Sequence, residues 1–139
     1  MTRRRVYLPV APTDLAALAE AGRIERGTGY AVTANVRAEL EERDAEEQEF
    51  EAFSEAATAA GELVAEPTRR VVVSVDVDAA GLREHAEEFA RVDGVPAVTA
   101  RDVAAFHVDE GEQHDDDQLL WFDAAELPAV IALVGPAGG

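Results

Sequence analysis

The chain has 139 residues, with 29 Asp or Glu against 12 Lys or Arg and a formal net charge of −17 at pH 7. Such an acidic protein is a poor candidate for binding nucleic acid or an anionic membrane, because phosphate groups are bound by basic surfaces. The absence of cysteine excludes disulfides, thiol catalysis and Cys-ligated metals, and no apolar run approaches the roughly 18 residues of a membrane-spanning helix. We therefore expect a cytoplasmic protein whose charge attracts a basic partner or a divalent cation.

The first third of the chain predicts short strands and a short helix. Arg5–Val10 alternates apolar residues at the two-residue period of a strand, and Pro9 is expected near its end or at a sheet edge. A helix is predicted from an N-cap at Asp14 to Gly22, which suits the residue after a helix. Tyr30–Thr33 is predicted to form a second short strand.

The stretch from residue 34 to residue 66 predicts two helices. It is rich in Ala and Glu, which favour helix, and Thr33 can cap its start. Few apolar residues occur in the turns around Arg43–Asp44, so we expect a break there, followed by a long helix. One face of that helix carries an apolar stripe at spacings of three and four residues, formed by Phe50, Phe53, Ala57, Ala60 and Val64.

The segment Arg69–Asp78 holds the densest run of β-branched residues and predicts a central strand that is buried on both faces. A helix with Leu82, Ala86 and Phe89 on its core face is predicted to follow. The remaining predicted elements are strands at Val95–Thr99, Val103–Asp109 and Leu119–Asp123 and a helix from Pro128 to about Val134.

This order of elements predicts an α/β fold, with α+β as the other possibility. Strands separated by helices favour parallel crossovers, whereas the last two strands favour an antiparallel hairpin. We therefore expect a mixed sheet of five to six strands covered by helices, with a C-terminal antiparallel hairpin. Residues 1–134 should form one domain and residues 135–139 a disordered tail.

Several short motifs spread over most of the chain carry a family resemblance. They are VYLP near the start, YAVT before an acidic helix, EEQEFEA, RRVVV, AFHVDE and LLWFDAAEL. Together they resemble an uncharacterised family of small actinobacterial proteins, a domain of unknown function. The resemblance implies a bacterial cytoplasmic protein and brings no activity, cofactor or catalytic residue with it.

Four polar residues form the strongest candidate for a chemical site. His107 and Asp109 lie two apart on a predicted strand and therefore on one face, and Asp76 and Asp78 end the central strand. If both strand ends lie at one edge of the sheet, the four side chains would suit Mg²⁺ or Mn²⁺ and phosphoester hydrolysis. The alternative is that Asp78 caps a helix and Asp109 begins a turn.

The remaining candidate is aromatic. Trp121, the only tryptophan, lies in a strand that is apolar on both faces, where it either packs in the core or provides an aromatic floor for a ligand or partner. The candidate binding residues are Tyr7, His107, Asp109 and Trp121. No nucleophile elbow, dinucleotide-binding or phosphate-binding glycine motif is present, and no catalytic residue can be assigned.

These observations favour a non-enzymatic acidic domain that binds another protein or regulates it, without a cofactor. A divalent-metal-dependent phosphoester hydrolase using Mg or Mn is the alternative. The high net charge favours a monomer over a homodimer through mutual repulsion.

Overall fold

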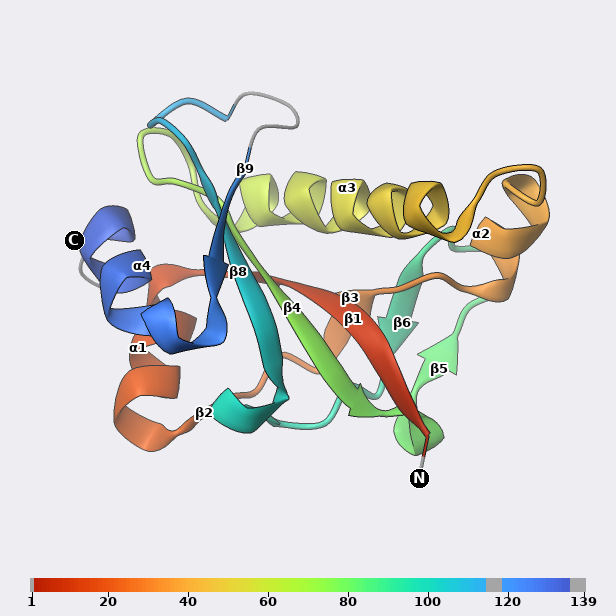
Figure 1. Ribbon diagram of the computed structural model, residues 1–139, viewed down its shortest axis with the longest axis horizontal. Coiled ribbons are helices and arrows are strands. Elements are labelled where there is room, and N and C mark those ends of the chain that lie inside the picture. The colour runs from red at the N-terminus through yellow and green to blue at the C-terminus, as the bar shows by residue number, and fades with distance from the viewer. Residues whose placement is uncertain (1, 115–118, 136–139) are drawn as a thin grey trace.

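The computed structural model describes residues 2–114 and 119–135, which form an antiparallel sheet with helices on both faces (Figure 1). The α-helices of these residues are α1 (Pro12–Ala21), α2 (Ala34–Glu39), α3 (Ala45–Leu63) and α4 (Leu127–Val134). The strands are β1 (Arg3–Val10), β2 (Arg23–Ile24), β3 (Thr28–Tyr30), β4 (Val71–Asp78), β5 (Arg83–Glu84), β6 (Arg91–Asp93), β7 (Val98–Thr99), β8 (Val103–Asp109) and β9 (Leu119–Asp123).

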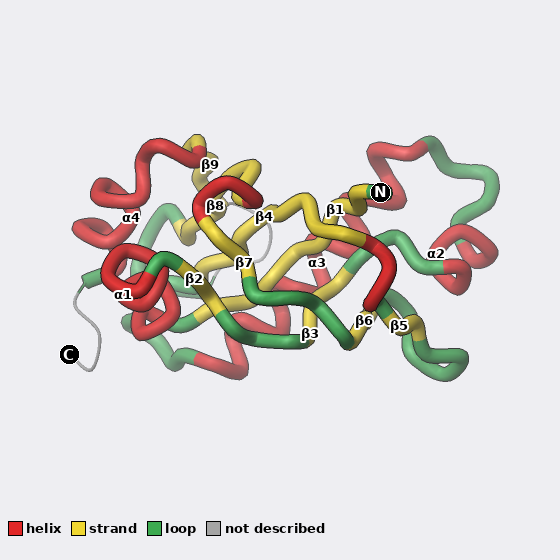
Figure 2. The backbone as a smooth tube through the Cα atoms, turned by 90° about the horizontal axis from the view of Figure 1, so that it is seen from below, coloured by secondary structure: helices red, strands yellow, loops and turns green. Residues whose placement is uncertain are grey.

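The main sheet contains seven strands of the described residues in the order β5-β6-β3-β1-β4-β8-β9, and β2 and β7 pair side by side in a small second sheet (Figure 2). Every strand pairing in this part of the chain is antiparallel. The fold is therefore α+β. The predicted parallel crossovers and the count of five to six strands are wrong, because β3 and β4, which α2 and α3 connect, are not neighbours: β1 lies between them.

The central strand β4 is confirmed, and it lies between β1 and β8. It pairs with β1 over the whole length of both strands, from Arg3 opposite Asp78 to Val10 opposite Val71. Its valines are buried on both faces of the sheet. A strand of this kind needs neighbours on both edges and helices on both faces, which accounts for its place near the middle of the sheet.

Two clusters of buried side chains cover the two faces of the sheet. On one face the alternate β1 residues pack with α1 and α4, in a cluster that includes Val6, Leu8, Leu15, Leu18 and Val130. On the other face α2 and α3 pack in a cluster that includes Tyr7, Val36, Ala52, Ala56 and Val72. In Figure 1, α3 crosses the upper part of the view, while α1 and α4 lie together at the left.

The predicted break in the long helical stretch is confirmed, and the buried face of α3 coincides with the predicted stripe at Ala57 and Ala60 only. Asp44 is the N-cap of α3, and its carboxylate accepts a hydrogen bond from the Glu47 amide at 2.9 Å. The buried residues of α3 are Ala52, Ala56, Ala57 and Ala60. Phe50 remains 48% exposed, because the alanine face allows the helix to lie close to the sheet and turns the start of the predicted stripe outward.

The helix predicted after the central strand is wrong. Residues Ala79–Gly81 form a single 3₁₀ turn, and β5 follows it. The carbonyls of His85, Ala86 and Glu88, which would accept hydrogen bonds in a helix, accept instead from the side-chain amide of Asn35. A tertiary contact therefore holds this segment as an irregular loop.

The C-terminal hairpin is confirmed, with β8 and β9 antiparallel from Ala105 opposite Asp123 to Asp109 opposite Leu119. Helix α4 begins one residue before Pro128, a position where proline removes no helical hydrogen bond. Residues 136–139 of the predicted disordered tail lie outside the described residues.

Candidate functional site

A row of polar and aromatic side chains crosses four neighbouring strands on the α3 face of the sheet. Tyr7 of β1 lies opposite Ser74 of β4, and His107 of β8 lies opposite Trp121 of β9. His107 also pairs with Val72, two residues before Ser74, so Ser74 and His107 are diagonal neighbours. Because paired residues share one face of a sheet, all of these side chains lie on the side that α3 covers.

His107 is held as a neutral imidazole at the centre of this row. Its Nε2 is 2.6 Å from the Ser74 hydroxyl oxygen, and the Phe53 ring meets it edge-on with 4.9 Å between ring centroids. Burial, followed by the positive charge of Arg5, lowers the pKa of His107 to about 4. Ser74 is only 2% exposed, so this pair orients the imidazole ring and does not present a nucleophile to a substrate.

Two further polar contacts surround the histidine. The Tyr7 hydroxyl donates to Glu49 Oε1 at 2.8 Å, and burial, followed by this bond, raises the pKa of Tyr7 far above its usual value. Arg5 donates two hydrogen bonds to the Asp76 carboxylate, at 2.8 and 3.1 Å. The charge of Arg5 is therefore paired within the protein. Phe53 packs edge-on against Tyr7 as well, with 5.9 Å between the ring centroids.

These side chains line an open hollow of about 560 Å³, which we call the aromatic hollow. Its floor is Arg5, Tyr7 and His107 of the sheet, and its walls are Glu46, Glu49, Phe50 and Phe53 of α3 and Leu119 of β9. Phe50 on its rim is 48% exposed. Trp121 lies beside it, on the same face as Leu119 and opposite His107, and is 63% exposed. Large aromatic surface is thus open to solvent at Phe50 and at Trp121.

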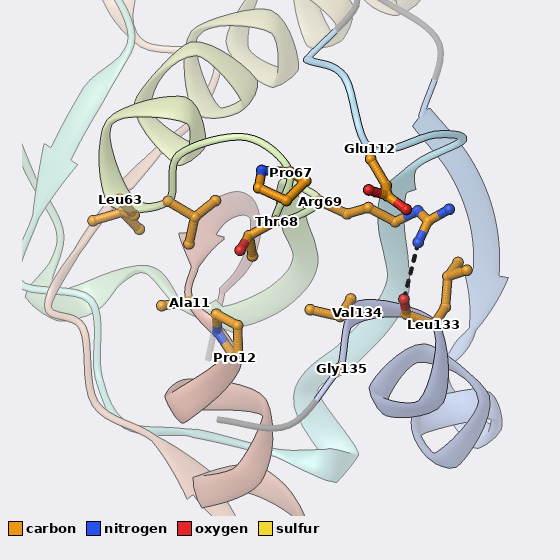
Figure 3. A pocket seen from close by; sticks show the side chains of 11 residues that line it. Ala11, Pro12, Leu63, Pro67, Thr68, Arg69, Glu112, Leu133, Val134 and Gly135 are labelled. Atoms are coloured by element: carbon orange, nitrogen blue, oxygen red, sulfur yellow. Dashed lines mark hydrogen bonds between the residues drawn. The ribbon is translucent and has the colours of Figure 1, made fainter. Parts of the chain in front are cut away.

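A second hollow, of about 610 Å³, lies where the turn at residues 64–69 meets the start of α1 and the end of α4 (Figure 3). Its one cation, Arg69, donates from Nη1 to the Leu133 carbonyl at 3.1 Å. That carbonyl belongs to the last turn of α4, where a positive charge complements the helix dipole. The contact joins α4 to the start of β4 and gives Arg69 a structural role.

Asp109, a predicted site residue, is part of the core. It is 1% exposed, and its carboxylate accepts from the Arg70 backbone amide at 2.8 Å, from Arg70 Nε at 3.0 Å and from Arg70 Nη2 at 2.8 Å. Although it shares a face with His107, its oxygen atoms point to a different partner. Of the four predicted binding residues, the structure brings together Tyr7, His107 and Trp121 and places Asp109 in a buried ion pair.

The four residues of the predicted metal site do not converge. Because β4 and β8 are antiparallel, Asp76 and Asp78 lie at the opposite end of the sheet from Asp109, about 20 Å away at roughly 3.4 Å per residue. Asp76 is bound by Arg5, and Asp78 caps the following 3₁₀ turn through the Ala80 amide. In residues 2–114 and 119–135 no group of three or more His, Asp or Glu side chains is placed to hold a metal ion.

Sequence reasoning missed Ser74, Glu49 and Phe53 as members of one site. Ser74 has a weak signal, since it is the only polar residue within the valine run before Asp76. Glu49 has none, because it is one of many acids on α3. Their neighbours are set by the pairing of strands distant in the sequence, which spacing along the chain does not reveal.

Comparison with known proteins gives one match. The model of a family described as "Family of unknown function (DUF6912)" matches residues 4–116, which include the floor of the hollow and the α3 walls. None of the curated proteins and none of the solved structures matches the chain. No helix in the described part of the chain is long and apolar enough to cross a lipid bilayer.

Proposed function

The chain belongs to this family of unknown function, and we propose that it is a cytoplasmic, non-enzymatic domain that binds another protein at the aromatic hollow. The partner contributes a positively charged side chain, Arg or Lys, to the hollow. The observation that carries the proposal is the exposure of Phe50, which lines an opening together with two carboxylates, and of Trp121, which pairs with His107 of its floor.

The exposed aromatic side chains support a binding role. Aromatic residues are enriched at the centres of protein interfaces, where they provide large contact areas at small entropic cost. Phe50 and Trp121 are among the four large apolar side chains that are exposed in the described residues. Phe50 lines the hollow, and Trp121 pairs across the strands with His107 of its floor. Placed there, they can be covered together by a single partner.

The charges of the hollow support a cationic ligand group. Glu46 and Glu49 line one wall, and the whole chain has a net charge of −17. The one cation of the hollow, Arg5, is paired with Asp76 by two hydrogen bonds. An Arg or Lys side chain could stack on Phe50 and meet the glutamates, which combines a cation–π contact with an ion pair.

The test is a titration of the protein with two blocked ten-residue peptides, one alternating Arg and Val and the other alternating Glu and Val. Binding is followed by amide chemical shifts and by the fluorescence of Trp121. We expect the basic peptide to bind and to perturb residues of the aromatic hollow. Phe50→Ala and Trp121→Ala should each weaken binding roughly tenfold, the loss typical of an interface anchor.

A matched pair of variants separates a specific site from general attraction between opposite charges. Glu46→Gln/Glu49→Gln removes two charges from the hollow and keeps an acceptor for the Tyr7 hydroxyl. Glu20→Gln/Glu25→Gln removes two exposed charges elsewhere on the surface. The first should weaken binding at least about fivefold more than the second. Equal effects of the two pairs, or no binding of the basic peptide, would refute the proposal.

A further inference from the structure

We infer that the partner segment binds as an additional strand on the open edge of β9, so that its alternate side chains lie over the aromatic hollow. This inference rests on the proposed function and specifies the kind of partner: an extended segment with basic residues at every second position. In the described part of the chain no strand pairs with the outer edge of β9.

The hydrogen-bonding direction of β8 determines which groups of β9 face outward. The Asp109 amide donates to the Arg70 carbonyl at 3.1 Å, so the backbone groups of Asp109 point toward β4. Those of His107, two residues away, point the same way, because backbone direction alternates along a strand. Neither residue therefore exchanges hydrogen bonds with β9. Their partners there, Leu119 and Trp121, have their N–H and C=O groups directed to the open edge.

The other end of β9 supports the same assignment independently. Asp123 is next in the alternating series after Trp121, and its amide should also point away from β8. That amide donates to Glu126 Oε1 at 3.0 Å, within the capping box of the following 3₁₀ turn. The chain thus satisfies the outward donor at Asp123 with its own side chain, and the open backbone groups of the edge are those of Leu119 and Trp121.

The open backbone groups of β9 belong to the same residues whose side chains lie at the aromatic hollow. Leu119 lines the aromatic hollow, and Trp121 lies on the same face, two residues along. A strand that pairs with their open backbone groups therefore places every second side chain beside Trp121 and over the hollow. An added strand gains affinity from its backbone hydrogen bonds and specificity from pockets for alternate side chains, which is a recurrent mode of peptide recognition.

The two edges of the sheet differ in a way that favours this use. The opposite edge is β5, which has only two residues, Arg83 and Glu84, both charged and exposed. Short, charged edges of this kind oppose pairing with other chains. β9 has five residues, LLWFD, without Lys, Pro or a bulge, and Leu120 and Trp121 are 39% and 63% exposed. An apolar edge without such protection suits a strand supplied by a partner.

The charge of the chain indicates which partner supplies the strand. A second copy would bring another net charge of −17 to an edge that already ends in Asp123. A basic segment instead places its cations beside Glu46 and Glu49 of the hollow. We therefore assign the edge to a basic segment of another protein rather than to self-association.

The first test uses two N-methylated forms of the alternating Arg and Val peptide, one methylated at each Arg amide and the other at each Val amide. Both carry the same charge, and each lacks the hydrogen-bond donors of one edge of the extended peptide. We expect only one of them to lose affinity, by roughly tenfold or more, as for two lost hydrogen bonds. Loss from the Arg-methylated form indicates antiparallel pairing, and loss from the Val-methylated form indicates parallel pairing. Equal affinities of the two forms would overturn the inference.

The second test is hydrogen exchange of the backbone amides. With the unmethylated peptide bound, the amides of Leu119 and Trp121 should become protected, while those of Arg83 and Glu84 on the opposite edge should not. If the peptide binds and the Glu46→Gln/Glu49→Gln variant weakens it, but Trp121 gains no protection, the strand inference fails and the proposed function stands. A peptide that does not bind refutes the proposed function itself. A dimer by light scattering with Trp121 already protected in the free protein would assign the edge to a second copy and overturn the inference.

Discussion

The imidazole of His107 should make the protein less stable as the pH falls from 7 to 5. Its pKa in the folded protein is about 4, lowered from 6.5 first by burial and then by the charge of Arg5. Between these two values the unfolded chain binds a proton that the folded protein does not. The contribution of His107 to the unfolding free energy is therefore fully present above pH 6.5. It is lost as the pH falls toward 4, and below pH 4 the loss levels off.

The size of the effect follows from the two pKa values. A difference of 2.5 units corresponds to about 3 kcal/mol of unfolding free energy, at roughly 1.4 kcal/mol per unit. Integrating the same two titrations gives a loss of about 2 kcal/mol between pH 7 and pH 5. This is a large share of the stability of a typical domain, about 5–15 kcal/mol.

The assay is urea unfolding at pH 7, 6 and 5, followed by circular dichroism, for the wild-type protein and His107→Gln. Other groups titrate in both proteins, including Glu55, whose pKa is raised by burial, so the difference between the proteins isolates His107. We expect that difference to change by about 2 kcal/mol over this range, in favour of the variant at pH 5. A difference that stays constant within about 0.5 kcal/mol would refute a buried, neutral His107.

The cause of the shift can be tested separately by following the His107 ring signals in NMR spectra. Phe53→Ala removes the ring that packs on the imidazole, so water should reach His107 and its pKa should rise toward 6.5. Phe50→Ala is the matched control: it removes a neighbouring aromatic side chain of α3 that is 48% exposed and should leave the His107 pKa near 4. Equal titrations in the two variants would show that Phe53 is not the source of the desolvation.

Three further predictions concern stability and are measured by urea unfolding at pH 7. Asp109→Ala removes the buried carboxylate that binds the Arg70 guanidinium and should cost about 3–5 kcal/mol. The double variant Asp109→Ala/Arg70→Met should recover part of this loss, and no recovery would contradict a charge effect. Ala56→Leu overfills the contact between α3 and the sheet and should cost about 1–3 kcal/mol, whereas Phe50→Ala should change stability by less than about 1 kcal/mol; a reversed order would mean that Phe50, and not Ala56, is buried against the sheet. Gly29→Ala should cost about 1–3 kcal/mol, because a Cβ there would lie 2.5 Å from a methyl carbon of Val6; an unchanged stability would mean that β1 and β3 separate freely.

The local elements were predictable wherever a short sequence signal determines them. Thr33 caps α2 as expected, because an N-cap needs only a side-chain oxygen within reach of an amide three residues on. Asp14, the other predicted N-cap, lies in the first turn of α1 instead, and Ala11 is the N-cap there. The valine run of β4 indicates burial on both faces by its composition alone. The loop at residues 85–88 was not predictable, although the segment has a helical pattern. Its carbonyl groups accept hydrogen bonds from the side chain of Asn35, which lies 50 residues away in the sequence.

The candidate site was less predictable than the fold, because its residues obtain their neighbours from the strand register and not from the composition of the chain. His107 and Asp109 are two apart on one strand face and were expected to act together. Arg70, the residue before β4, binds the carboxylate of Asp109 and buries it. The position diagonal to His107 is Ser74, which leaves the imidazole neutral beside an open hollow.

The same register explains how the proposed binding surface and a buried ion pair can lie next to each other. Asp109 lies at the end of β8 next to the hairpin loop. His107, two residues earlier, lies in the part of the sheet where the start of α3 leaves the face open. The backbone groups of both residues point toward β4, so the amides of their partners on β9 are directed outward. Covering those amides with a strand from another protein would close the hollow without disturbing the Arg70–Asp109 pair. A ligand bound there should therefore change the exposure of Trp121 and leave the cost of Asp109→Ala unchanged, whereas a changed cost would mean that the two ends of the hairpin are energetically coupled.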